Sequence, residues 1–207
     1  LVPIIVGCIV LSKQIVEVLF QRNAFTSKDT TMTASILLIY VIGILAFALR
    51  DVLTRGFYSM EDSKTPMINS IISIVFNISL NLILVKPLGY KGLAIATAVS
   101  AYIGLFLFNR SMKKKIEGYS SRDNYIVFAK ALFAALIMGL GVKLIYVILG
   151  TSLVGGLLLK LIALLSAVGV GVIIYAIVMH FLKVEEYEMI FDMFFGVVKR
   201  KIKKLQK

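Results

Sequence analysis

Two long stretches of this sequence contain no acidic residue. The first lies between Asp62 and Glu117, and the second between Asp123 and Glu185. Each is long enough to cross a bilayer twice, because a spanning helix needs about 20 residues. Since 59% of the chain is apolar and only 16% is charged, water is not the solvent for most of it. We therefore predict that each stretch forms a helical hairpin within a membrane.

Breaker residues divide the apolar part of the chain into six segments. Asn23 lies in the first connection, and Pro66 lies at the start of the third segment. Pro87, Gly89 and Gly92 separate the third segment from the fourth. No segment alternates like a barrel strand, and an open sheet would leave backbone groups unpaired in lipid. The predicted fold class is all-α, a polytopic membrane helix bundle with about six transmembrane helices. The expected segments are 1–20, 31–53, 66–85, 92–108, 125–149 and 154–182.

Several classes of function are excluded by the distribution of reactive and charged residues. The net charge of +12 does not indicate a nucleic-acid partner, because the cations lie between apolar runs. Cys8 and His180 are each single, so a disulfide framework and a metal site are excluded. Within the connections, Glu61 and Asp62 form the only local acidic pair, too little for a membrane enzyme. We expect no catalytic residue, no metal and no enzyme activity.

Lysine and arginine are concentrated in alternate connections. Residues 109–124 and 183–207 are strongly basic, whereas 150–155 contain no cation. Because basic loops stay in the cytoplasm, we expect a cytoplasmic C-terminus. Apolar residues recur at helical spacing along 183–207, which predicts an amphipathic basic tail on the inner membrane surface. The tail would be attracted to anionic lipid headgroups, and a plain anchoring role explains it.

The first half of the chain carries a series of motifs in a characteristic order. They are Ala24, Phe25, Thr26 and Asp29, then RGFYSMEDSKTP (55–66), Asn77 with Asn81, and KPLGYKGLAIAT (86–97). In these residues the chain resembles the MviN/MurJ lipid II flippases, of the multidrug/oligosaccharidyl-lipid/polysaccharide exporter superfamily. The resemblance covers the chain to about Asn109, and beyond that only the topology is similar.

The resemblance implies a place within a fourteen-helix transporter whose two six-helix lobes rock around a cavity. Residues 1–110 would be the last four helices of the C-terminal lobe, the first of them truncated. Residues 111–182 would be two additional transmembrane helices, which would shape a groove for a long lipid tail, and 183–207 the cytoplasmic tail. The missing N-terminal lobe would be a partner, and it holds most of the family's cavity arginines.

The function that the resemblance implies is transport of lipid II, the lipid-linked peptidoglycan precursor, across the bacterial cytoplasmic membrane by alternating access. The partners would then be lipid II and membrane lipids. An exporter of another lipid-linked oligosaccharide or of a drug would share the architecture. A membrane scaffold without transport activity is a further alternative.

One face of the third predicted helix is polar throughout, because Asn69, Ser73, Asn77 and Asn81 recur every four residues. Such a face is expected to meet a cavity, a partner helix or an ion rather than lipid. Thr97, in the next helix, would lie opposite. Asn77, Asn81 and Thr97 could supply neutral oxygens to Na⁺, with interhelical hydrogen bonding as the alternative. Relatives thought to use sodium have an acidic residue at the position of Asn81, and this sequence departs from them there, which counts against the ion site.

The connection between the second and third helices is a candidate cytoplasmic gate or hinge. Arg55, Asp62 and Lys64 could form ion pairs there, Thr65 could cap the next helix, and Pro66 fits its first turn. These charge pairs would differ between inward-open and outward-open states. A tight, well-capped turn that only fixes helix order explains the same residues.

Charged residues inside the predicted spans can be explained by ion pairing or by extension to the headgroups. Arg50 and Asp51 are neighbours of opposite charge, which can pair with each other or extend to the headgroups. Lys143 and Lys160 are close enough to the outer helix ends to extend to the interface. A pyrophosphate-contacting role for either lysine is an alternative.

Overall fold

The computed structural model describes residues 1–116, 122–152 and 156–182, and every regular element in that part of the chain is a helix. All six helices are long and apolar enough to cross a membrane. The predicted all-α bundle with six spans is thereby confirmed, while the predicted tail, 183–207, lies outside the described residues. The helices are α1 (Val2–Phe20), α2 (Ser27–Ser59), α3 (Lys64–Leu88), α4 (Tyr90–Lys115), α5 (Arg122–Ser152) and α6 (Leu157–Phe181).

Several helices are longer than hydropathy predicts, because polar turns extend them beyond the apolar runs. α2 begins at Ser27, where Thr26 and Asp29 form a reciprocal capping box. The Thr26 N–H donates to Asp29 Oδ2 at 2.9 Å, and the Asp29 N–H donates to Thr26 Oγ1 at 3.4 Å. α4 likewise continues to Lys115. Hydropathy alone places helix ends at the edge of the apolar run, whereas at the start of α2 a capping box sets the end.

The turn between α3 and α4 is tighter than predicted. Pro87 lies inside the last turn of α3, and Gly92 lies inside α4, so Gly89 alone forms the break, with φ of 55°. The prediction that all three residues separate the helices was wrong. Gly92 is needed for a close approach instead, because a Cβ there would lie 2.2 Å from the carbonyl oxygen of Leu84.

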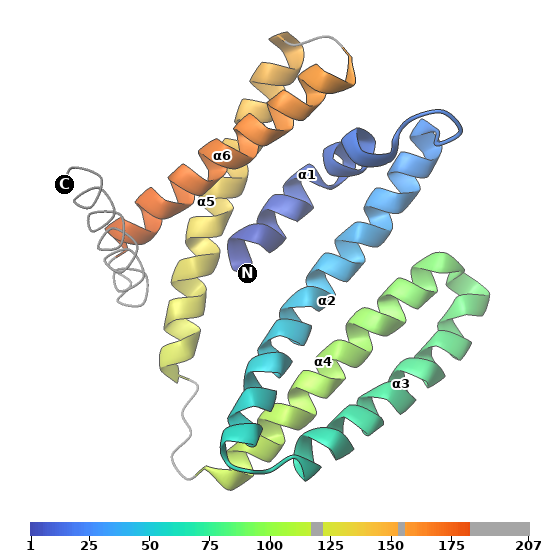
Figure 1. Ribbon diagram of the computed structural model, residues 1–207, viewed down its shortest axis with the longest axis vertical. Coiled ribbons are helices and arrows are strands. Elements are labelled where there is room, and N and C mark those ends of the chain that lie inside the picture. Colours follow the sequence, from blue (N-terminus) through green and yellow to red (C-terminus); the bar gives the residue numbers. More distant parts are fainter. Residues whose placement is uncertain (117–121, 153–155, 183–207) are drawn as a thin grey trace, which may run out of the picture.

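The helices form two groups, which α1 and α2 connect. α4 packs between α2 and α3, and this group is called the α2–α3–α4 unit (Figure 1). α5 and α6 pack against each other and against α1, and this group is called the α1–α5–α6 unit. Among the described residues, α5 and α6 make no contact with α2, α3 or α4. α1 therefore packs with the two additional helices as well as with α2.

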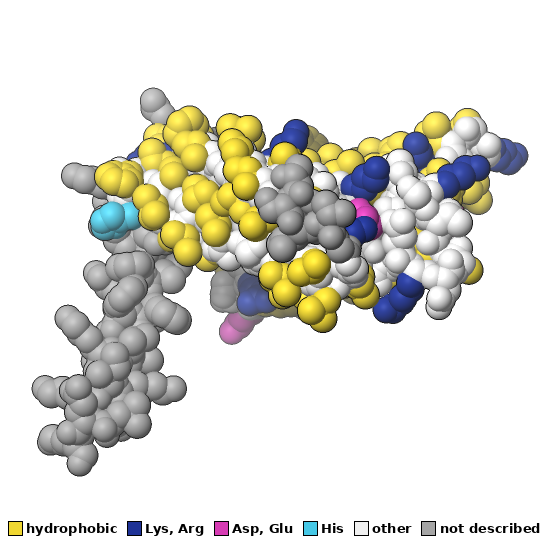
Figure 2. All heavy atoms as spheres, turned by 90° about the horizontal axis from the view of Figure 1, so that it is seen from above, with side chains coloured by type: hydrophobic (Ala, Val, Ile, Leu, Met, Phe, Trp, Pro, Cys, Tyr) yellow, Lys and Arg dark blue, Asp and Glu magenta, His cyan; other side chains and the backbone are white. Residues whose placement is uncertain are grey.

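The two units are packed with different side chains. α4 buries a series of small residues, and the Gly43 position on α2 lies so close that a Cβ there would be 3.2 Å from Ala98 Cα. The core of the other unit combines larger apolar residues, including Leu11, Met138 and Val142, with the buried alanines Ala135 and Ala167. Figure 2 shows hydrophobic side chains over much of the surface on the side of α5 and α6, with Lys and Arg concentrated on the opposite side. Large apolar side chains are exposed on all six helices, as lipid-facing helices require.

Candidate functional site

The polar face of α3 is directed at α4. Asn69 and Ser73 are buried, and Asn77 is half-buried. Asn69 Nδ2 donates to Ser111 Oγ at 3.0 Å, and Asn77 Nδ2 donates to Ser100 Oγ at 3.0 Å. Of the environments predicted for this face, the partner helix is therefore the one that these two asparagines meet. The hydrogen bonds fix the register of α3 against α4 over about two turns of α3.

The three residues of the predicted cation site are only partly brought together. Asn81 Nδ2 donates to Asn77 Oδ1 at 3.0 Å, which leaves Asn81 Oδ1 buried and without a hydrogen-bond partner among the described residues. Thr97 Oγ1 donates to the carbonyl oxygen of Leu93 at 2.9 Å, within its own helix. The free carbonyl oxygen of Asn81 fits a cation ligand. The Na⁺ site remains a prediction.

A pocket of 210 Å³, with polar groups in a mainly apolar wall, lies where α2, α3 and α4 converge. It brings the predicted residues Ser73, Asn77 and Thr97 together with an arginine that sequence reasoning had not assigned to them. The lining residues are Phe47, Arg50, Ser73, Ile74, Asn77, Thr97, Ser100 and Ala101.

Arg50 does not pair with Asp51, so of the two alternatives the pairing was wrong, while extension to the headgroups stays a prediction. Asp51 Oδ2 accepts instead from Arg55 Nη2 at 3.0 Å, four residues further along α2. The guanidinium carbon of Arg50 lies 5.2 Å from the centre of the Phe47 ring, one turn earlier. Helical spacing could have revealed this arrangement, because residues 47 and 50 share a face whereas 50 and 51 do not.

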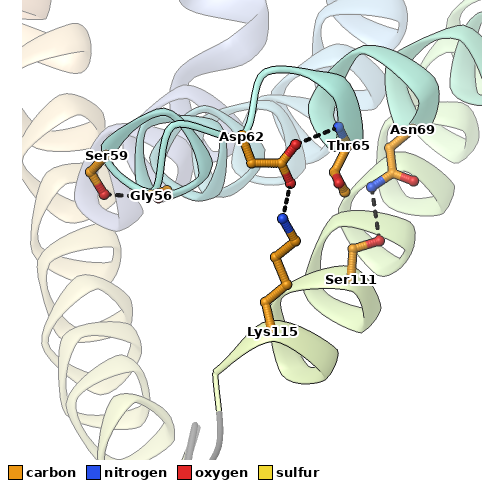
Figure 3. Close-up of polar contacts among 7 residues, drawn as sticks. All are labelled: Gly56, Ser59, Asp62, Thr65, Asn69, Ser111 and Lys115. Carbon is orange, nitrogen blue, oxygen red and sulfur yellow. Dashed lines mark hydrogen bonds and ion pairs between the residues drawn. The ribbon is translucent and has the colours of Figure 1, made fainter.

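The α2–α3 connection is fastened to the end of α4 (Figure 3). Asp62 Oδ1 accepts from the Thr65 N–H at 3.0 Å, and Asp62 Oδ2 forms an ion pair with Lys115. Hydrogen bonding to the Lys115 ammonium, and secondarily to Thr65, holds the pKa of Asp62 well below its usual range. The carboxylate therefore stays ionised at neutral pH and links α3 to α4.

Two predicted details of this connection were wrong. Among the described residues no ion pair joins Arg55, Asp62 and Lys64 to one another, since Arg55 pairs with Asp51 and Asp62 with Lys115. Thr65 does not cap α3 either. Ser63 is at the N-cap position without a side-chain bond, and the Asp62 carboxylate accepts the free N–H. Pro66 is buried in the first turn of α3, as predicted.

The α1–α5–α6 unit lines a second, apolar cavity of 310 Å³ that is partly open at the surface. Its walls come from α1 as well as from α5 and α6. The groove for a lipid tail that we expected the last two helices to shape stays a prediction. The lining residues are Pro3, Ile4, Gly7, Cys8, Leu11, Ile15, Met138, Val142, Val168, Gly171, Val172 and Tyr175. Such a cavity suits an alkyl or isoprenoid chain, because its walls offer almost no polar group.

An ion pair that the sequence did not suggest joins α1 to α6. Lys160 Nζ lies 2.6 Å from Glu17 Oε1. Lys160 was expected to extend to the headgroups, and it reaches this carboxylate instead. The two residues are 143 positions apart, so no local pattern could have paired them.

Comparisons with known proteins agree on one family. The family model described as "Lipid II flippase MurJ" matches residues 1–164, well beyond the limit near Asn109 that the motifs indicated. A protein of Vibrio cholerae named "Probable lipid II flippase MurJ" is 33% identical over 183 residues, 88% of this chain and 35% of the relative. A Thermotoga maritima protein of the same name is 32% identical, over 91% of this chain and 36% of the relative.

A solved structure is similar as well. "Lipid II flippase MurJ, inward closed conformation" superposes with a TM-score of 0.67 at 29% identity, over 87% of this chain and 36% of that one. The chain thus spans little more than a third of the length of the relatives it matches. The described residues contain no group of three or more His, Cys, Asp or Glu that could hold a metal ion.

Proposed function

Because this chain belongs to the MurJ family of lipid II flippases, we propose that the full-length protein carries lipid II across the bacterial cytoplasmic membrane by alternating access. The observation that supports this most is the family match over 164 residues, joined to six helices that can span a membrane. The remaining two thirds of the relatives' length would supply the other lobe and the rest of the cavity. The family is one of transporters, and no catalytic step is part of the proposal.

We propose that the C-terminus and the α2–α3 connection face the cytoplasm. The basic residues Lys113, Lys114 and Lys115 end α4, at the same end of the molecule as the α2–α3 connection (Figure 1). Single cysteines at Lys113 and at Lys91, at the opposite end of α4, test this orientation. A membrane-impermeant thiol reagent added to intact cells is expected to label position 91 and not position 113, and the reverse pattern would contradict the proposal.

Within the transport cycle, the α2–α3–α4 unit is proposed to move as one rigid body. Three side-chain contacts join α4 to α3 or to the α2–α3 connection. They are Asn69–Ser111, Asn77–Ser100 and Asp62–Lys115. A gate or hinge was predicted at Arg55, Asp62, Lys64 and Pro66. In this proposal these residues would keep a fixed geometry, and rearrangement would occur at the outer surfaces of the unit. Double electron–electron resonance between labels on α3 and α4 is expected to give one distance in all transport states.

The apolar cavity of the α1–α5–α6 unit is proposed to hold part of the lipid tail. Its volume of 310 Å³ and its apolar walls fit a segment of a long hydrocarbon chain, while the headgroup would occupy the polar cavity between the lobes. Replacing Gly7 by Phe would fill this cavity. The variant is expected to fold and to lose transport, and full transport by a folded Gly7→Phe protein would contradict the role.

A sodium site is proposed at Asn77, Asn81 and Thr97, and at no other residues. The free Oδ1 of Asn81 supports it. In the full-length protein, Asn81→Ala is expected to abolish sodium binding measured by calorimetry and to remove the sodium dependence of transport. Unchanged sodium binding would leave interhelical hydrogen bonding as the role of these residues.

The overall function is tested by complementation. Cells depleted of their own lipid II flippase are expected to recover growth and surface-exposed lipid II when they produce the full-length protein. Failure to restore lipid II translocation, with the protein present in the membrane, would contradict the proposal. Restored export of a different lipid-linked oligosaccharide would instead identify the rival exporter.

A further inference from the structure

Helix α5 packs closely against both of its neighbours at glycine positions. A Cβ added at Gly139 of α5 would lie 2.8 Å from Val6 Cγ1 of α1. A Cβ added at Gly171 of α6 would lie 2.5 Å from Val142 Cγ2 of α5. Backbones that approach so closely leave little room for movement. Helix α5 is therefore the base of the apolar cavity, and α1 and α6 are two walls that rest on it.

The two walls are joined to each other by a different kind of contact. The atoms nearest to a Cβ added at Gly7 of α1 or at Gly171 of α6 belong to α5, and a Cβ at Gly169 would meet nothing within 4 Å. These glycines therefore bring neither wall close to the other. Between the walls lies an ion pair instead, in which Lys160 Nζ is 2.6 Å from Glu17 Oε1.

This ion pair lies beyond one end of the cavity, on the side of the α1–α2 connection. Ile15 is the lining residue of α1 nearest to that connection, and Glu17 is two residues further on, about 3 Å along the helix axis. Lys160 precedes Val168, the first lining residue of α6, by eight residues. Its long side chain reaches Glu17, and both side chains are partly exposed. The pair thus bridges the two walls of a cavity that is partly open at the surface.

We propose that the Glu17–Lys160 ion pair controls the passage of a hydrocarbon chain between the bilayer and this cavity. With the pair formed, α1 and α6 are held together at one end, and the space between them is narrow. With the pair broken, both helices still pack on α5, but α6 can move away from α1. A partly exposed ion pair contributes little to stability, so it breaks and forms again readily, as a reversible contact requires. This role rests on the proposed function of the cavity as a site for part of the lipid tail.

Cys8 reports on access to the cavity, because this half-buried residue lines it. The full-length protein, with any other cysteine replaced by serine, is placed in lipid nanodiscs and treated with pyrenylmaleimide, a thiol reagent that partitions into lipid. Fluorescence gives the rate of Cys8 modification. We expect Glu17→Gln to raise this rate about threefold, the order expected for the loss of a partly exposed ion pair. Glu17→Lys should raise it further, because two like charges then face each other.

Exchanging the two residues, Glu17→Lys with Lys160→Glu, reverses the pair and is expected to return the rate to that of the unchanged protein. Lys28→Gln is the matched control and should leave the rate unchanged. Lys28 is an exposed lysine near the same end of the molecule, and it forms no ion pair among the described residues. If Cys8 is modified equally fast in the unchanged protein, Glu17→Gln and Glu17→Lys, the proposal is overturned.

Salt separates control of access from a general loss of stability, and it needs no variant that fails to fold. High salt screens a partly exposed ion pair. We therefore expect it to speed Cys8 modification in the unchanged protein and in the exchanged variant, but not in Glu17→Gln. A rate in the unchanged protein that salt does not alter would also overturn the proposal.

Geranylgeraniol, an isoprenoid alcohol, separates this proposal from the role of the cavity itself. If the cavity holds a hydrocarbon chain, the alcohol should slow Cys8 modification. Without such protection the tail-binding role would be contradicted, whereas rates that still follow the charges at positions 17 and 160 would support the ion pair as the control of access. Protection together with equal rates in all variants would support the tail-binding role and overturn the control by Glu17 and Lys160.

Discussion

The α2–α3–α4 unit and the α1–α5–α6 unit solve the same packing problem in different ways. In the first, amide and hydroxyl side chains bond across the α3–α4 interface, and small residues let α2 and α4 approach closely. In the second, large apolar side chains pack around a cavity of 310 Å³, with one ion pair between α1 and α6. Lipid is as apolar as leucine, so apolar contacts alone give little preference for one helix neighbour over another. Polar contacts therefore specify which helices are neighbours in the α2–α3–α4 unit, and the larger of the two cavities lies in the α1–α5–α6 unit.

Substituting one glycine in each unit gives the largest expected difference. A Cβ at Gly92 would lie 2.2 Å from a backbone oxygen, so Gly92→Ala forces the α3–α4 turn apart. We expect it to cost about 3 kcal/mol or more. Gly169→Ala, where a Cβ meets nothing within 4 Å, is the control and should leave stability almost unchanged. The measurement is the yield of monodisperse protein and its thermal unfolding in detergent; equal behaviour of the two variants would contradict the difference in packing.

The hydrogen bonds of the polar unit give the next largest effect. Asn69→Leu removes the bond to Ser111 from a buried position, and we expect it to cost about 1–2 kcal/mol. A double-mutant cycle with Ser111→Ala isolates the pair, whose coupling should be about 0.6 kcal/mol or more. Ser79→Ala is the control, because Ser79 is exposed and bonds only within its own helix. A coupling near zero would mean that apolar packing, and not this bond, sets the register of α3.

The sequence predicted the helices of the α2–α3–α4 unit and its polar face, but few of the contacts between those helices. Six spans follow from apolar runs, and the polar face of α3 follows from a four-residue repeat, because both are local properties. The partners of that face, Ser100 and Ser111, are 23 and 42 residues away. Asp62 and Lys115 are 53 apart. Which charge meets which is decided by how α4 lies against α3, and pairing by proximity in the sequence led to the wrong partners for Arg50, Asp62 and Lys64.

Even fewer contacts of the α1–α5–α6 unit could be predicted from the sequence. The topology of its helices was expected, but the packing of α1 against α5 and α6 joins residues from opposite ends of the chain. Helices α5 and α6 have no repeating polar face from which a neighbour could be inferred. Leu11 illustrates this, since it is almost completely buried against residues of α5 and α6, while its sequence neighbourhood is as apolar as a lipid-facing surface.

The ion pair of the α2–α3 connection should show a pH dependence with a definite sign. The pKa of Asp62 is depressed in the folded protein, so its contribution to stability is present above the unfolded pKa, near 3.9. It is lost as pH falls through the folded value. The difference in unfolding temperature between the unchanged protein and Asp62→Asn should thus be constant from about pH 5 to pH 8 and shrink only in strong acid. A difference that already shrinks between pH 7 and pH 5 would show that the carboxylate is not held by Lys115.

The smallest effect is expected from the ion pair of the apolar unit. The Glu17 and Lys160 side chains are 26% and 45% exposed, and solvent or headgroups screen such a pair, so Glu17→Gln should cost less than about 1 kcal/mol. The loss should diminish further in high salt, and exchanging the two residues, Glu17→Lys with Lys160→Glu, should restore it. A loss as large as that of Asn69→Leu would mean that a charged contact fastens α1 to α6 as firmly as amides fasten α3 to α4. In that case the α1–α5–α6 unit would owe its arrangement to polar side chains too.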